Sequence, residues 1–124
     1  MEDLGTTNAN RYVSPEVAHF HPGVAKMWCL WQADATIDND YGVTDITDNG
    51  AGNWTVNTDV DWSGANAQAY SVNMRTDSVG STDGTIGQVA SFASNAVQVI
   101  VFDYADGTLT DAAKMTVIGF GDFA

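Results

Sequence analysis

Apolar and polar residues alternate along most of the chain beyond Gly23, which is the pattern of half-buried β-strands. In 96–104, three valines at alternating positions face opposite to Ile100 and Phe102. The strands are expected at 24–32, 43–48, 53–58, 67–75, 85–94, 96–104 and 113–120. About seven short strands separated by turn residues predict an all-β domain over 23–124, an antiparallel β-sandwich of jelly-roll-like type.

Clusters of Asp, Asn, Ser and Gly lie between these strands and predict turns. The stretches expected to turn are Asp38-Asn39-Asp40, Trp62-Ser63-Gly64, Ser81-Thr82-Asp83-Gly84 and Ala105-Asp106-Gly107. The clearest turn signal is Asn49-Gly50, because alternating runs flank it on both sides. Residues 43–58 are therefore predicted to form a β-hairpin with a loop longer than two residues.

The loop of this hairpin also carries enough side-chain oxygens to be tested as a calcium site. With Gly50 at the sixth position of an EF-hand loop, the first, third and fifth positions carry Asp, Thr and Asn. Val56 then occupies the twelfth position, where a bidentate carboxylate is required. The EF-hand motif fails, so the hairpin is the preferred interpretation.

Residues 1–22 contain both prolines and both histidines and show little periodicity, which predicts an extended N-terminal arm that docks on another surface. His19 and His21 would point the same way on an extended chain. In a homotrimer, three such pairs would place six imidazoles around one metal on the axis, and imidazole suits Zn, Fe or Ni. The alternative is two packed or surface histidines that bind no metal.

The net charge is −12, since 16 acidic residues face only 4 Lys and Arg. Such a chain repels nucleic acid and anionic membranes, so neither is expected as a partner. A calcium role stays open for Asp38, Asp40, Asp59 and Asp61. We see no signal peptide and no transmembrane span, which predicts synthesis in a cytoplasm.

The sequence offers no convincing catalytic constellation. No Ser stands in a Gly-x-Ser-x-Gly elbow, and Cys29 lies among apolar neighbours that predict a buried, inert thiol. Asp59 and Asp61 precede Trp62 and would suit a glycosidase, but carboxylates in turns are the simpler explanation. The chain is predicted not to be an enzyme.

Three tryptophans are candidates for an interface or a ligand platform. Trp28 and Trp31 face opposite sides of one predicted strand, so one of them is expected to leave the core. Trp62 stands just before a predicted turn. Tryptophan is favoured both at protein interfaces and at sugar-binding platforms.

Two motifs resemble a small β-rich module of tailed phages. They are PGVAKMW at 22–28 and ITDNGAGNWTVN at 46–57, and the similarity covers roughly 22–76. Modules of that group are usually described as tail-fibre or virion proteins. The resemblance implies a virion location after synthesis in the host cytoplasm.

The resulting expectation is a non-enzymatic bacteriophage structural protein, a homotrimeric fibre or spike module that contributes to host attachment. Its partners would be further copies of itself, other virion proteins and a host-surface glycan. One alternative is a capsid decoration protein that stabilises the shell. Another is a free carbohydrate-binding module that uses Trp62 or Trp31 to stack on sugar.

Overall fold

The computed structural model describes residues 24–60, 62, 68–75 and 84–121. The predicted arm at 1–22, with His19 and His21, lies outside these residues, and so does Asp61.

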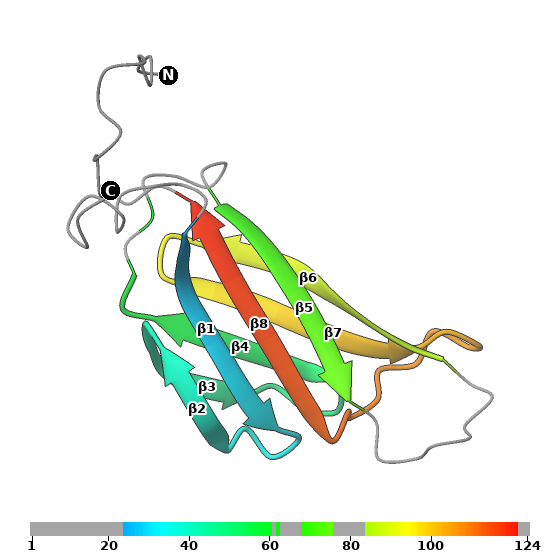
Figure 1. The fold of residues 1–124 in the computed structure, drawn as a ribbon. Coiled ribbons are helices and arrows are strands. Elements are labelled where there is room, and N and C mark those ends of the chain that lie inside the picture. The colour runs from blue at the N-terminus through cyan, green and yellow to red at the C-terminus, as the bar shows by residue number, and fades with distance from the viewer. Residues whose placement is uncertain (1–23, 61, 63–67, 76–83, 122–124) are drawn as a thin grey trace, which may run out of the picture.

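The described residues form eight strands in two antiparallel four-stranded sheets, so the predicted all-β sandwich is confirmed. The strands are β1 (Ala25–Gln32), β2 (Ile37–Tyr41), β3 (Val43–Asp48), β4 (Asn53–Thr58), β5 (Gln68–Arg75), β6 (Thr85–Ala93), β7 (Ala96–Asp103) and β8 (Lys114–Gly121). One sheet has the order β2-β1-β8-β5 and faces the viewer in Figure 1, and the other has the order β3-β4-β7-β6.

The core lies between the two sheets and follows from the alternation of each strand. Every second residue of β1, β4, β7 and β8 is buried. The fully buried side chains include Met27, Trp31, Trp54, Val99 and Val117. The edge strand β5 is less covered by its neighbours. Its residues that point toward the core are only half-buried. The centre of the sandwich is therefore well packed, and its β5–β6 side is more open.

The predicted hairpin is confirmed at both flanks. Strands β3 and β4 pair antiparallel, with Ile46 opposite Val56 and Asp48 opposite Trp54. The loop between them needs positive φ at Gly50 (109°) and Gly52 (64°). The chain therefore uses this Gly-rich stretch as a turn.

Gly52 also fixes the hairpin loop to the rest of the sandwich. Its N–H donates to the Asp111 carboxylate at 2.7 Å, and its carbonyl accepts from the N–H of Val101 at 2.8 Å. A Cβ at this position would lie 2.4 Å from the Val101 carbonyl oxygen and 2.5 Å from the Thr110 nitrogen. Glycine is therefore required by the close approach of two backbone segments.

The prediction of a turn at Asp38-Asn39-Asp40 is wrong, because these residues lie in β2 and make the strand count eight. Asn39 pairs with Leu30 and Asp40 with Cys29 along β1. The turn falls earlier, where the Gln32 N–H donates to the Thr36 carbonyl at 2.9 Å and Ala35 has a φ of 65°. Charged residues are common on edge strands, where they discourage pairing with other chains.

Candidate functional site

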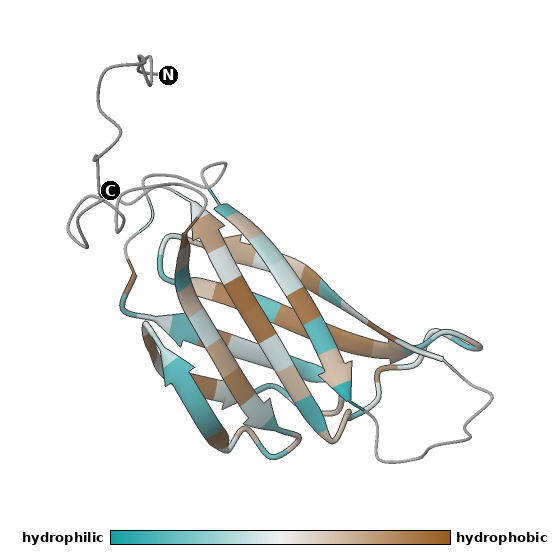
Figure 2. Ribbon diagram, in the orientation of Figure 1, coloured by the Kyte–Doolittle hydropathy of each residue, from teal (hydrophilic) through white to brown (hydrophobic). Residues whose placement is uncertain are grey.

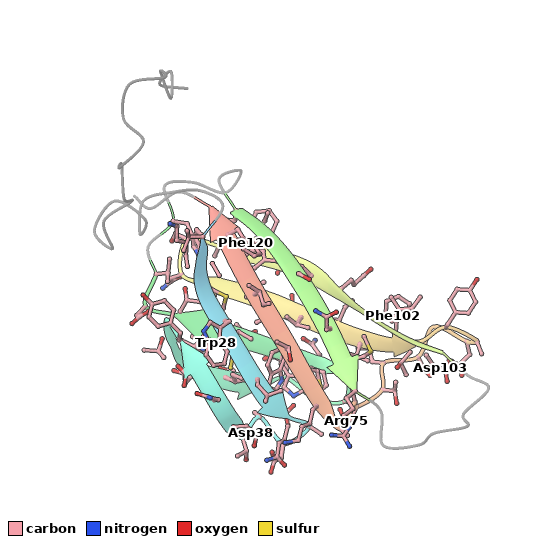
Figure 3. All side chains as sticks on the ribbon, in the orientation of Figure 1. Trp28, Asp38, Arg75, Phe102, Asp103 and Phe120 are labelled. Atoms are coloured by element: carbon pink, nitrogen blue, oxygen red, sulfur yellow. The ribbon has the colours of Figure 1, made fainter. Side chains whose placement is uncertain are left out.

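The three candidate tryptophans differ in how far they are buried. Trp31 is completely buried and Trp62 is 2% exposed, so neither offers its ring to a ligand at the surface of this chain. Trp28 points to the opposite side of β1 from Trp31 and is half-buried on the outer face of its sheet (Figure 3). The expected opposite orientation of Trp28 and Trp31 is confirmed, and Trp28 is the member that leaves the core.

Trp28 belongs to a group of large side chains on the outer face of sheet β2-β1-β8-β5. Register places it directly between Tyr41 of β2 and Ile118 of β8. Leu30 and Phe120 extend the group along β1 and β8, and we name Trp28, Leu30, Tyr41, Ile118 and Phe120 the outer apolar patch. Tyr41 is 51% exposed, and the other four members are half-buried. Figure 2 shows apolar residues along β1 and β8, beside a largely hydrophilic β2.

One part of the outer face of sheet β3-β4-β7-β6 is polar, and there side-chain amides and hydroxyls form hydrogen bonds between the strands. Gln98 Nε2 donates to Asn53 Oδ1 at 2.9 Å, and Ser91 Oγ donates to Gln98 Oε1 at 2.9 Å. Asn49 Nδ2 donates to Thr55 Oγ1 at 2.8 Å and more weakly to Asn53 Oδ1 at 3.4 Å. We name these five residues the amide network. The five residues come from β6, β7, β4 and the hairpin loop. Their mutual hydrogen bonds hold each side chain in one orientation.

A β-bulge in β6 places Ser91 within hydrogen-bonding distance of Gln98 in β7. Val89 lies opposite Val99, and Ser91 lies opposite Gln98, so Ala90 is an extra residue in β6. Without the bulge Ala90 would face Gln98 and no hydroxyl would reach its amide. Bulges commonly redirect side chains in this way and are frequent beside functional sites.

The amide network borders an open hollow of about 260 Å³. Asn49, Thr55, Ser91 and Gln98 supply the polar part of its wall, and Phe92 with two alanines supplies the apolar part. Phe92 is 44% exposed. No charged side chain is found among the described residues that line it.

A row of aromatic rings holds Phe92 in place. Trp62 meets Tyr70 edge to face at 6.0 Å between ring centroids, and Tyr70 lies 6.3 Å from Phe92. The backbone N–H of Trp62 donates to the Ser94 carbonyl at 3.2 Å, which ties this residue to the turn after β6. Burial raises the pKa of Tyr70 to about 12, and its hydroxyl donates to Gln68 Oε1 at 2.6 Å. These rings lie on the core side of β6, because Phe92 is opposite the buried Val97.

Several acidic residues lie on the edge strands β2 and β3. In the part of the chain that the structure describes, no three His, Cys, Asp or Glu side chains are grouped to hold a metal. Asp38 forms an ion pair with Lys114 and accepts from Gln32 Nε2 at 2.7 Å. These hydrogen bonds to Lys114 and Gln32 lower the pKa of Asp38. Each oxygen of this carboxylate therefore accepts one hydrogen bond from a neighbouring side chain.

Two further buried groups, a thiol and an ammonium, belong to β1. Cys29 is fully buried, and burial first and the nearby Asp40 second raise its pKa to about 12. A thiol in this state is a poor nucleophile. Lys26 is 1% exposed beside an irregularity in the β1–β8 pairing, and it has an interaction partner. Within the described ranges, no helix is long and apolar enough to cross a membrane.

The amide network and its hollow were not predicted from the sequence. The signal was present in part, because Asn53, Thr55 and Gln98 occupy outward positions between buried residues of their strands. Such residues meet only when their strands are neighbours in the sheet. The alternation of polar and apolar residues within one strand does not reveal which strands lie beside it.

No protein-family model, no curated protein and no solved structure matches the chain.

Proposed function

We propose that this chain is a non-enzymatic structural protein of a bacteriophage virion, a fibre- or spike-type module that assembles as a homotrimer and contributes to host attachment. The observation that supports assembly is the outer apolar patch. An antiparallel sheet usually packs one face on the core and leaves the other face polar. Sheet β2-β1-β8-β5 instead carries large apolar side chains on both faces.

Contiguous apolar patches on a protein surface mark contacts with other molecules, and Trp and Tyr are enriched at the centre of such contacts. Trp28 and Tyr41 lie side by side in the outer apolar patch. The partner proposed here is a second and a third copy of the chain. The resemblance of 22–76 to tailed-phage modules supports the virion as the place where this assembly works.

The experiment is the solution mass of the purified chain by light scattering. A trimer should have three times the 13.2 kDa of one chain. Ile118→Lys, in the outer apolar patch, should yield a folded monomer, because an ammonium in a buried interface is costly. Ile100→Lys is the matched control, since Ile100 is half-buried on the outer face of the other sheet, and it should remain trimeric. A monomeric wild-type protein would overturn the proposed assembly.

Two further arms of the experiment address the metal and the place on the particle. A trimer that dissociates in chelator would support the axial metal proposed for His19 and His21.

A fibre or spike module added free should block infection, whereas a capsid decoration protein should bind purified capsids in many copies and raise their thermal tolerance.

A further inference from the structure

We infer that the hollow bordered by the amide network is a binding site for a neutral saccharide, about one sugar ring in size. This site lies on sheet β3-β4-β7-β6, on the opposite side of the sandwich from the outer apolar patch. It does not rest on the proposed assembly, because a monomer can bind sugar and a trimer can fail to bind it.

The chemistry of the wall fits a polyol. A sugar hydroxyl is both donor and acceptor, so its best partners are side chains that offer both functions, namely amides and hydroxyls. The hollow presents two amides, Asn49 and Gln98, and two hydroxyls, Thr55 and Ser91. Among the hydrogen bonds of the described residues, Asn49 uses only its NH2 group, so its Oδ1 is open to a hydroxyl donor.

The same hydrogen bonds prepare the wall for a ligand. Gln98 donates to Asn53 and accepts from Ser91, which leaves its second N–H and a second lone pair for a ligand. Side chains that are already ordered lose little entropy on binding, so more of the interaction energy appears as affinity. Ala93 and Ala96 add a small apolar surface beside these polar groups.

Charge and size restrict the ligand class. None of the described residues that line the hollow is Lys or Arg, and the chain has a net charge of −12, so an anionic sugar would be repelled. The volume of about 260 Å³ is just below the range of about 300–1,000 Å³ that is usual for drug-sized ligands. One neutral ring of a longer glycan is the ligand that fits both limits.

The test is an NMR titration of the full ¹⁵N-labelled chain with the methyl glycosides of glucose, galactose, mannose and N-acetylglucosamine. At least one of them should cause saturable shifts of the Asn49 and Gln98 side-chain amides. N-acetylneuraminic acid is the anionic probe and should cause none. Absence of saturation for all four neutral probes up to about 50 mM, well above a millimolar Kd, would overturn the proposal.

Variants then locate the site. Gln98→Ala and Ser91→Ala should each weaken the binding that is found by about tenfold, since each removes one or two hydrogen-bonding groups. Gln88→Ala is the matched control, because Gln88 is exposed on β6 and does not line the hollow, and it should leave the affinity unchanged. Thermal melts of all three variants confirm folding. Unchanged affinity in both Gln98→Ala and Ser91→Ala would overturn the assignment of the site.

Discussion

The indole of Trp31 in one sheet meets the indole of Trp54 in the other sheet edge to face, with ring centroids 6.4 Å apart and an interplanar angle of 69°. Both side chains are completely buried. Edge-to-face pairs add stabilisation beyond the burial of their surfaces, roughly 0.5–1.5 kcal/mol. This contact therefore joins the two sheets at the centre of the core.

The two rings differ in their hydrogen bonds, and this difference leads to a first prediction. Trp54 Nε1 donates to the Ala33 carbonyl at 3.1 Å, whereas Trp31 Nε1 is buried without an acceptor in the described part of the chain. Trp54→Phe should therefore lower the free energy of unfolding by about 1 kcal/mol more than Trp31→Phe does, because it also leaves the Ala33 carbonyl without its donor. Urea unfolding at equal protein concentrations measures both, and an equal or larger loss for Trp31→Phe would contradict the prediction.

A second prediction compares the two glycines of the hairpin loop. Gly52→Ala should destabilise the chain severely, by more than about 3 kcal/mol, because its Cβ would overlap the backbone of Val101 and Thr110. Gly50→Ala is the control. Gly50 also has a positive φ, but a Cβ added there would have no neighbour within 4 Å. It should cost only the backbone strain, about 1–3 kcal/mol. Thermal and urea unfolding measure the difference, and similar losses in both variants would show that the close approach of Gly52 is unimportant.

The sequence predicted the hairpin of β3 and β4 because two independent signals agreed there. Both flanks alternate, and Asn49-Gly50 lies between them with a residue type that tolerates positive φ. The same reasoning failed for β2, where Asp38-Asn39-Asp40 reads as a turn. In the structure the backbone pairing with β1 overrides these local preferences, because an edge strand can keep polar side chains in solvent.

The candidate site was harder to predict because it depends on neighbours in space. Ser91, Gln98 and Asn53 lie on three strands, and they meet only in the order β6-β7-β4. One signal was available in β6, where Val89 and Phe92 are three positions apart although a regular strand repeats every two. The bulge at Ala90 resolves this spacing and also places Ser91 opposite Gln98.

A third prediction concerns acid. Hydrogen bonds to Lys114 and Gln32 lower the pKa of Asp38 in the folded chain. A carboxylate with a depressed folded pKa stabilises the fold above its unfolded pKa of about 3.9, and the stabilisation is lost as pH falls through the folded value. Asp38→Asn should therefore lower the melting temperature near neutral pH and make little difference in strong acid.

The ion pair with Lys114 provides the control for this prediction. In a Lys114→Met background, most of the effect of Asp38→Asn near neutral pH should disappear, because Lys114 is the largest cause of the lowered pKa. Melting temperatures of the four proteins across pH form a double-mutant cycle. An undiminished effect of Asp38→Asn without Lys114 would mean that the ion pair does not stabilise the fold.

The last prediction concerns base and the single thiol. Burial raises the pKa of Cys29 from its ordinary value of 9.0 to about 12, so the thiol stays protonated in the folded chain at pH 8. The native protein should therefore not react with Ellman's reagent at pH 8, and it should react fully after unfolding in urea.

The same shift has a consequence for stability. Above the unfolded pKa the unfolded chain loses the thiol proton and the folded chain keeps it, so stability falls as pH rises from about 9.0 toward 12. Cys29→Ala removes this contribution, and its unfolding free energy should decline less steeply with pH than that of the wild type over the same interval. Rapid labelling of the native thiol, or parallel pH profiles for the two proteins, would show that Cys29 is more accessible than its burial indicates.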